Sequence, residues 1–221
     1  MPYPQTKISS PDVNVFIFSL LKEKHSKEYF EKLSSGKAGK GIFLSTVQRR
    51  LTRLLQMIRP SIEFFFKYCK NTGVREDTFL EHLEKDPKVE SKFIRIKKFS
   101  NLIRYMLRNN YNRSHIDIFC KEVGTCIENN INIFTKSPNE IIYTNDQDYL
   151  NRVSDEISKV CSFNDAEDLE HLALLNYWVH EMSKLSNIAF VTNDKPLHDI
   201  DISKHSKFIL IKYPEEFLKD L

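Results

Sequence analysis

The sequence predicts an α/β fold in which helices flank a mainly parallel sheet and an enlarged all-helical segment occupies the middle of the chain. Short apolar runs alternate with helical patterns near both ends of the chain, and this alternation is typical of βαβ units. Only five glycines occur, three of them between Gly36 and Gly41, so folds built on repeated glycine turns are disfavoured. The 221 residues are 41% hydrophobic and 29% charged, which suits a globular chain with a sizeable core.

The N-terminal part predicts a helix, a strand and a longer helix in that order. Asp12 stands before the apolar run that continues to Leu21, a natural N-cap position. A flexible turn over 34–41 leads to a strand at 42–45. The apolar residues then recur at helical spacing to about residue 69, and Pro60 predicts a break or a kink in this helix.

The middle of the chain predicts three helices, over about 76–85, 90–109 and 115–134. The second of these is amphipathic and basic, because its apolar residues form one face while most of its Lys and Arg residues lie elsewhere. We interpret the chain as a single domain over 1–221 with a helical insertion or cap over about 60–135.

The C-terminal part returns to alternating strands and helices. Strands are predicted at 141–144, 188–192 and 208–213. Helices are predicted at 147–160, from Asp165 to about Met182, and after Pro214, which is suited to a first helical turn. A loop is expected over 195–207.

Charge is unevenly distributed along the chain, although the net charge is only +3. The segment from Lys37 to Lys70 contains eight basic residues and one acid, and the segment from Lys88 to Arg113 contains eight basic residues and one acid. Acidic residues concentrate between 146 and 170. This separation suits an acidic pocket within a basic surround that attracts a polyanion. The alternative interpretation is that the basic and the acidic segments are both ordinary solvent-exposed helix faces.

The sequence features that report on location favour a cytoplasmic protein without a membrane partner. No apolar segment is long enough to span a membrane, and the first residues lack the apolar run of a secretory signal. The four cysteines form no C-x-x-C pair, so we interpret them as buried apolar residues.

Three acids are candidates for a metal site. Asp194 follows the strand at 188–192. Asp165 and Asp168 lie three residues apart, on one face at the start of the predicted buried helix that runs from Asp165 to about Met182. Ligands of open parallel sheets bind outside the carboxyl ends of the strands. Converging carboxylates repel one another, and Mg²⁺ or Mn²⁺ relieves that repulsion. Helix capping explains Asp165 equally well, and an ordinary turn explains Asp194.

Five motifs occur in order along the chain. They are Asp12-Val-Asn-Val-Phe-Ile17, Ile42-Phe-Leu-Ser45 followed by a helix, Asp168-Leu-Glu-His-Leu-Ala173, Phe190-Val-Thr-Asn-Asp194, and the closing segment 209–218. Their order and spacing resemble the PIN domain family over roughly 8–60 and 140–218. The resemblance implies a PIN-like parallel sheet and a Mg²⁺- or Mn²⁺-dependent ribonuclease that cleaves single-stranded RNA.

The resemblance also implies which residues bind metal and RNA. Asp12, Asp168 and Asp194 correspond to catalytic metal ligands, with Asp165 as a possible helper. Some members of the family are toxin ribonucleases, so a protein inhibitor or complex partner is a possible partner beside RNA.

The chain departs from the family in the helix after the second strand. A Glu is usual there, whereas this chain has Arg49 and Arg50 and no acid. Either arginine would weaken metal binding, or could hold a phosphate bidentately. With Lys195 they are the candidate nucleic-acid-binding residues. The alternative function is therefore a degenerate, catalytically inactive PIN-like module that binds RNA or a protein partner.

Overall fold

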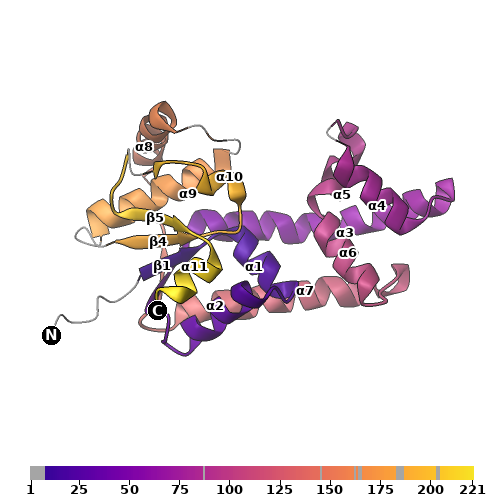
Figure 1. The fold of residues 1–221 in the computed structure, drawn as a ribbon, viewed down its shortest axis with the longest axis horizontal. Helices are drawn as coiled ribbons and strands as arrows, with labels where there is room; N and C mark the ends of the chain where they lie inside the picture. Colours follow the sequence, from indigo (N-terminus) through magenta and orange to yellow (C-terminus); the bar gives the residue numbers. More distant parts are fainter. Residues whose placement is uncertain are drawn as a thin grey trace. The chain divides into compact units, whose positions relative to one another are not determined.

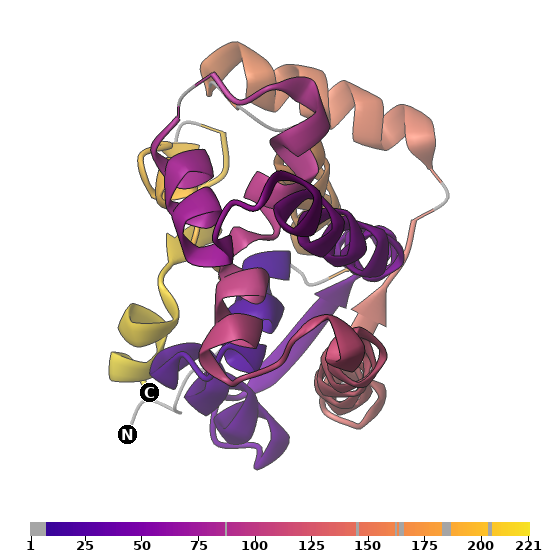
Figure 2. The same ribbon diagram turned by 90° about the vertical axis from the view of Figure 1, so that its right-hand side faces the viewer.

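The computed structural model describes residues 8–86, 88–144, 146–161, 163, 166–182, 187–202 and 205–221. The chain divides into two compact units (Figures 1 and 2). The first, here called the sheet unit, comprises Met1–Leu51 and Ile127–Leu221, and the second, the helical unit, comprises Thr52–Cys126. No helix among the described residues is long and apolar enough to cross a membrane.

The sheet unit contains a five-stranded, all-parallel sheet, which confirms the predicted α/β class. Its strand order is β3-β2-β1-β4-β5. The strands are β1 (Ile8–Pro11), β2 (Lys40–Leu44), β3 (Glu140–Ile142), β4 (Ile188–Val191) and β5 (Ile209–Lys212). The chain therefore extends the sheet in one direction from β1 to β3, then returns to the other side of β1 to add β4 and β5.

Helices cover both faces of this sheet (Figure 1). The first group consists of α1 (Val13–Leu20), α2 (Lys24–Ser34) and α11 (Pro214–Lys219). The second group consists of α8 (Gln147–Val160) and α9 (Ala166–Tyr177), which lie on the opposite face. The short helix α10 (Lys195–His198) follows β4. Both faces of the sheet are thus shielded from water, as expected of an all-parallel sheet.

The helical unit contains no strand among its described residues. It holds α4 (Glu76–Lys85), α5 (Ile94–Lys98) and α6 (Ser100–Arg108), with short 3₁₀ turns at 91–93 and 113–115. It also holds parts of α3 (Ser45–Thr72) and α7 (Ile116–Asn132), since the unit boundaries fall within these two helices.

Most predicted elements are present, and three details were wrong. Helices α4 and α8 have the predicted bounds. Of the two predicted effects of Pro60, the break is wrong, because α3 runs through Pro60 as one helix with a continuous buried stripe, while the kink stays a prediction. The predicted helix over 90–109 is interrupted at Phe99, and a short helix, α10, lies in the predicted loop over 195–207.

Each unit has its own aromatic core. In the sheet unit, Phe16 packs against Phe30 and Phe43, and Phe43 stacks on Phe134. These four rings are almost fully buried. They join α1, α2, β2 and the 3₁₀ turn Ile133–Thr135 that precedes β3. In the helical unit, a second cluster contains Phe65, Tyr68, Phe79 and Phe93.

The polar strand β1 is the central strand of the sheet. Ser9 and Ser10 are fully buried there, although an apolar run is usual at such a position. The Ser9 hydroxyl shares a 3.0 Å hydrogen bond with the hydroxyl of Tyr29, which satisfies it inside the core. Backbone pairing on both sides of β1 therefore compensates for its low apolar content.

Gly41→Ala is expected to destabilise the sheet unit. A methyl group at this position would lie 2.8 Å from Phe134 Cε1, 2.9 Å from Leu33 Cδ2 and 3.0 Å from Asn139 Oδ1. Phe134 and Leu33 are buried and cannot move aside, so we expect a loss of about 1–3 kcal/mol in unfolding free energy by urea denaturation. Gly124→Ala in α7 is the matched control, because the added methyl meets nothing within 4 Å. It should be neutral or stabilising by about 0.5–1 kcal/mol. Equal effects of the two changes would contradict this account.

Candidate metal centre

The candidate site lies where the order of strands reverses. Asp12 directly follows β1, and Thr192 directly follows the neighbouring strand β4. The backbone N–H of Asp12 donates to the carbonyl of Val191 at 2.8 Å, which fixes the two strand ends beside each other. In open parallel sheets such a reversal leaves a crevice outside the carboxyl ends of the strands, and ligands bind there.

Asp12 is a buried carboxylate held in place by both of its oxygens. Oδ1 accepts a 2.6 Å hydrogen bond from the N–H of Val13 and so caps α1, as predicted. Oδ2 accepts a 2.9 Å hydrogen bond from the Thr192 hydroxyl. Burial raises the pKa of Asp12, while the charge of Arg50 and these two hydrogen bonds act to lower it and the charge of Asp194 acts to raise it. The nearby positive charge and hydrogen bonds therefore do not fully offset the cost of burying the ionised Asp12 carboxylate.

Helix α9 brings two more potential ligands to Asp12. Asp168 and His171 lie three residues apart, and so one turn apart, on this helix. Both are buried, with 6% and 1% of their surface exposed. One carboxylate oxygen of Asp12, one of Asp168 and one ring nitrogen of His171 lie within 4.8 Å of one another. Three side chains from two distant parts of the sequence thus converge as a metal site requires.

His171 is held by one ring nitrogen only. Its Nδ1 shares a 2.8 Å hydrogen bond with the hydroxyl of Thr46 at the start of α3. Its Nε2 is buried and has no hydrogen-bond partner among the residues that the structure describes. Burial, together with the smaller effect of the nearby charges of Arg50 and Arg49, lowers the pKa of His171 to about 3. The imidazole is consequently neutral at physiological pH, which is the form that binds metals.

An arginine at the start of α3 pairs with two acids of α9. Arg50 Nη1 lies 2.8 Å from Asp168 Oδ1, and Arg50 Nε lies 2.8 Å from Glu167 Oε2. The neighbouring Arg49 pairs with Glu170 further along α9. Arg50 thus supplies part of the positive charge that the buried carboxylates need, and it competes with any metal for Asp168.

The structure places the other predicted site residues around this group. Asp194 is half-buried at the N-cap of α10, outside the group of three, and its backbone N–H donates to the Thr192 hydroxyl at 3.0 Å. Its charge still reaches Asp12, since it raises the pKa of that carboxyl group. Lys195 is exposed beside it. Asp165 lies outside the described residues.

Sequence reasoning did not assign His171 to the site. The residue stands three positions after Asp168 in Asp168-Leu-Glu-His171, a spacing that puts two ligands on one helix face. That spacing was the available signal. It carried little weight by itself, because a lone histidine on an apolar helix face is usually an ordinary core residue.

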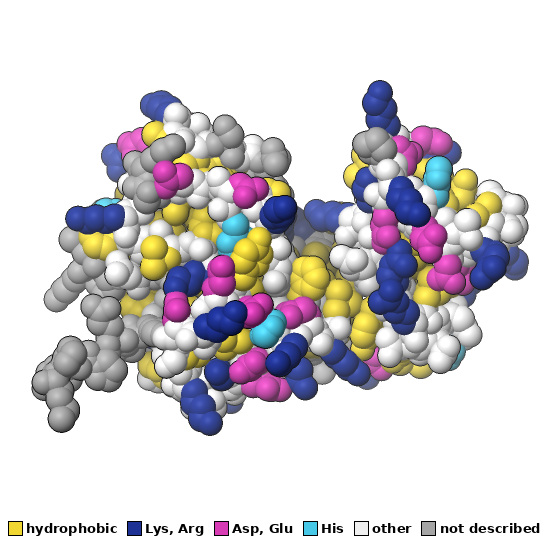
Figure 3. Space-filling view, viewed as in Figure 1, with side chains coloured by type: hydrophobic (Ala, Val, Ile, Leu, Met, Phe, Trp, Pro, Cys, Tyr) yellow, Lys and Arg dark blue, Asp and Glu magenta, His cyan; other side chains and the backbone are white. Residues whose placement is uncertain are grey.

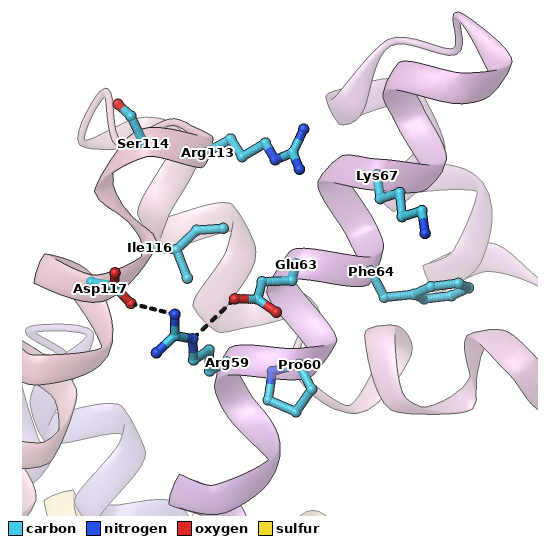
Figure 4. A pocket seen from close by; sticks show the side chains of 9 residues that line it. All are labelled: Arg59, Pro60, Glu63, Phe64, Lys67, Arg113, Ser114, Ile116 and Asp117. Carbon is cyan, nitrogen blue, oxygen red and sulfur yellow. Dashed lines mark hydrogen bonds and ion pairs between the residues drawn. The ribbon is translucent and has the colours of Figure 1, made fainter.

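A second hollow lies in the helical unit, between α3 and the start of α7 (Figure 4). Its volume is about 520 Å³, and its charged lining includes Arg59, Glu63 and Asp117. Arg59 lies 2.9 Å from Glu63 and 3.0 Å from Asp117, as the dashed lines in Figure 4 show. The acids of this hollow are thus paired with a cation at the open surface, unlike Asp12. We therefore place the candidate site in the sheet unit.

The fold and the site together define an α/β protein with a buried Asp-Asp-His group at the carboxyl edge of a parallel sheet. The chain matches no known family model, and neither a curated protein nor a solved structure is significantly similar to it. The donor set fits a divalent cation, because two carboxylates and a neutral imidazole converge and one buried ring nitrogen has no partner within the described part of the chain.

Acid should destabilise the metal-free protein partly through His171. The unfolded chain takes up a proton on this residue below about pH 6.5, while the folded protein takes it up only near pH 3. The contribution of neutral His171 to the free energy of unfolding is therefore fully present above about pH 6.5. It is lost as the pH falls towards 3, by at most about 1.4 kcal/mol per pH unit. Asp12 acts in the opposite direction, because its pKa is raised.

Comparison with His171→Asn isolates the contribution of the histidine. Urea unfolding between pH 7 and 4 in the presence of a chelator should give a steeper acid loss for the unchanged protein than for the variant. The test compares how steeply the free energy of unfolding falls with pH, so it remains valid if the variant is less stable at every pH. Parallel profiles would show that His171 is protonated alike in the folded and unfolded states.

Proposed function

We propose that the protein is a metal-dependent nuclease of PIN type that cleaves phosphodiester bonds in single-stranded RNA. The observation that carries the proposal is the convergence of Asp12 and Asp168 within 4.8 Å, where the strand order of a parallel sheet reverses. The resemblance of the sequence motifs to the PIN family supports the choice of substrate and of Mg²⁺ or Mn²⁺.

The protein groups have distinct roles in this proposal. Asp12 and Asp168 hold the cation, and Asp194 adds negative charge at the mouth of the site. Thr192 orients Asp12 through its 2.9 Å hydrogen bond and also accepts the backbone N–H of Asp194, so one hydroxyl links both acids. A bound divalent cation would stabilise the negative charge that develops on the phosphate group during cleavage.

Basic groups at the rim are suited to the RNA backbone. Lys195 is exposed immediately after Asp194, and the side chain of Arg49 is half-exposed, at 49%, beside Glu170. Figure 3 shows Lys and Arg side chains among Asp and Glu side chains on the visible face of the sheet unit, rather than one continuous basic patch. We therefore assign RNA contacts to individual residues near the site and expect a modest dependence of binding on salt.

Asp12→Asn tests the proposed activity. Asn retains the helix cap and the shape of the side chain but removes the buried charge. We expect Mn²⁺-dependent cleavage of a fluorescent single-stranded RNA to fall by at least about a hundredfold, while thermal unfolding of the metal-free protein occurs at the same or a higher temperature.

Asp155→Asn is the matched control, because Asp155 is an exposed residue of α8. It should leave cleavage unchanged. Equal cleavage by the Asp12 variant and the unchanged protein would reject the assignment, as would the absence of any Mn²⁺-dependent cleavage by the unchanged protein.

A second candidate function is that of a catalytically inactive PIN-like module that binds RNA or a protein partner. The 2.8 Å ion pair between Arg50 and Asp168 favours it, because the guanidinium neutralises a carboxylate that the reaction needs. Such a pair within a largely buried group is costly to break unless another cation replaces the guanidinium.

Arg50→Gln distinguishes the two functions. Removing the competing positive charge should strengthen Mn²⁺ binding about tenfold, measured by isothermal titration calorimetry. Arg49→Gln is the matched control, because Arg49 is the adjacent arginine but pairs with Glu170 instead of Asp168. If the unchanged protein binds no Mn²⁺ at millimolar concentration and only the Arg50 variant does, the inactive module is the better description. Micromolar binding together with cleavage by the unchanged protein would exclude it.

A further inference from the structure

We infer that His171 is a direct ligand of the bound metal, so that the site is a mixed nitrogen and oxygen site that takes a transition-metal dication such as Mn²⁺ or Zn²⁺ in preference to Mg²⁺. The inference rests on the proposed metal site of the sheet unit, and it extends that site by one ligand and by the class of metal. It does not depend on which reaction the metal supports.

The geometry of the ring is the first argument. A ring nitrogen of His171 lies within 4.8 Å of carboxylate oxygens of both Asp12 and Asp168. A single ion with ligands at about 2.0–2.2 Å bridges donor atoms up to about 4.4 Å apart, so a side-chain shift of about 0.4 Å at most completes the site. The three residues come from the end of β1 and from one face of α9, so the protein backbone fixes their approach.

The hydrogen bonding of the ring is the second, independent argument. Nδ1 is engaged by the Thr46 hydroxyl at 2.8 Å, which orients the imidazole from the side of α3. Nε2 is left buried with no partner in the described part of the chain, in a residue that is only 1% exposed. Metal-binding histidines commonly have this arrangement, with one nitrogen on the metal and the other held by a neighbouring group. A purely structural histidine would leave a buried polar atom unsatisfied, which is costly.

Asp12 can accept a metal without losing its present hydrogen bonds. Each carboxylate oxygen has two acceptor positions. Asp12 uses one position on each oxygen, for Val13 and for Thr192. The Arg50 guanidinium lies 2.8 Å from Asp168 Oδ1 and takes up one acceptor position of that carboxylate. His171 supplies the third protein ligand beside Asp12 and Asp168.

Nitrogen ligation changes which metal is preferred. Mg²⁺ favours all-oxygen surroundings and dehydrates reluctantly, whereas imidazole suits Zn²⁺ and other transition metals. Mn²⁺ accepts both oxygen and nitrogen ligands and has a paramagnetic signal. The expected order of affinity is thus Zn²⁺ above Mn²⁺, with Mg²⁺ weakest.

Pulsed electron paramagnetic resonance of the Mn²⁺-loaded full-length protein tests the inference directly. Imidazole coordination should give ¹⁴N modulation of the Mn²⁺ echo, and this modulation should disappear in His171→Asn. Asn can retain the bond to Thr46 while lacking an atom at the position of Nε2, so it removes the proposed ligand with little other change. Mn²⁺ that binds without ¹⁴N modulation, or no Mn²⁺ binding at millimolar concentration, would overturn the inference.

Calorimetry provides the second measurement. His171→Asn should weaken Zn²⁺ and Mn²⁺ binding by at least about tenfold and Mg²⁺ binding by less than about threefold. Thr46→Val is the matched control, because it removes the hydrogen bond to Nδ1 but leaves Nε2, and it should retain the ¹⁴N modulation. Equal losses for all three metals in His171→Asn would indicate a structural role and reject the inference.

RNA cleavage measured on the same samples separates this inference from the proposed function. Clear ¹⁴N modulation without RNA cleavage rejects the nuclease and retains His171 as a ligand. Cleavage by a Mn²⁺ centre that lacks ¹⁴N modulation retains the nuclease and rejects His171.

Discussion

The parallel pairing of β1 with β4 is the constraint on which the candidate site depends. The register aligns Pro11 with Val191, and the Asp12 N–H continues it by donating to the Val191 carbonyl. The carboxyl ends of both strands consequently meet at one edge, where the Thr192 hydroxyl reaches Asp12. A shift by one residue would turn the side chains after each strand to the opposite face and separate these two groups. The pairing of β1 with β4 thus decides that Asp12 and Thr192 meet at the candidate site.

The balance of charge within the site decides how its function is interpreted. Burial disfavours the ionised form of Asp12, and Arg50 provides the nearest compensating charge, which it shares with Asp168 and Glu167. A metal would supply more charge at the same place. Arg50 and a cation are therefore alternatives for stabilising the same carboxylates, and their competition separates an active nuclease from an inactive binding module. His171 adds a neutral donor, which increases the number of ligands without adding repulsion.

Local sequence patterns predicted most elements, because helical periodicity and apolar runs can be recognised within a short stretch of sequence. The amphipathic periods of α4 and α8, and the apolar runs of β4 and β5, are such signals. The break at Pro60 was wrong because the buried stripe of α3 continues on both sides of it, and packing of that stripe outweighs one lost hydrogen bond. The polar strand β1 had no clear local pattern, since its pairing with two neighbours and the Ser9–Tyr29 bond are long-range.

The sequence by itself determined the fold class, the position of Asp12 before an apolar run and that of Asp194 after one, because hydrophobic periodicity and turn chemistry are local properties. It also placed Arg49 and Arg50 without an acid in the first part of the helix after β2. Only the tertiary structure decided that Arg50 pairs with Asp168, that Asp194 lies outside the closest group, and that His171 belongs to it. These outcomes depend on how α3 and α9 approach the end of β1. Packing between elements far apart in the chain sets that approach, and no spacing along the sequence encodes it.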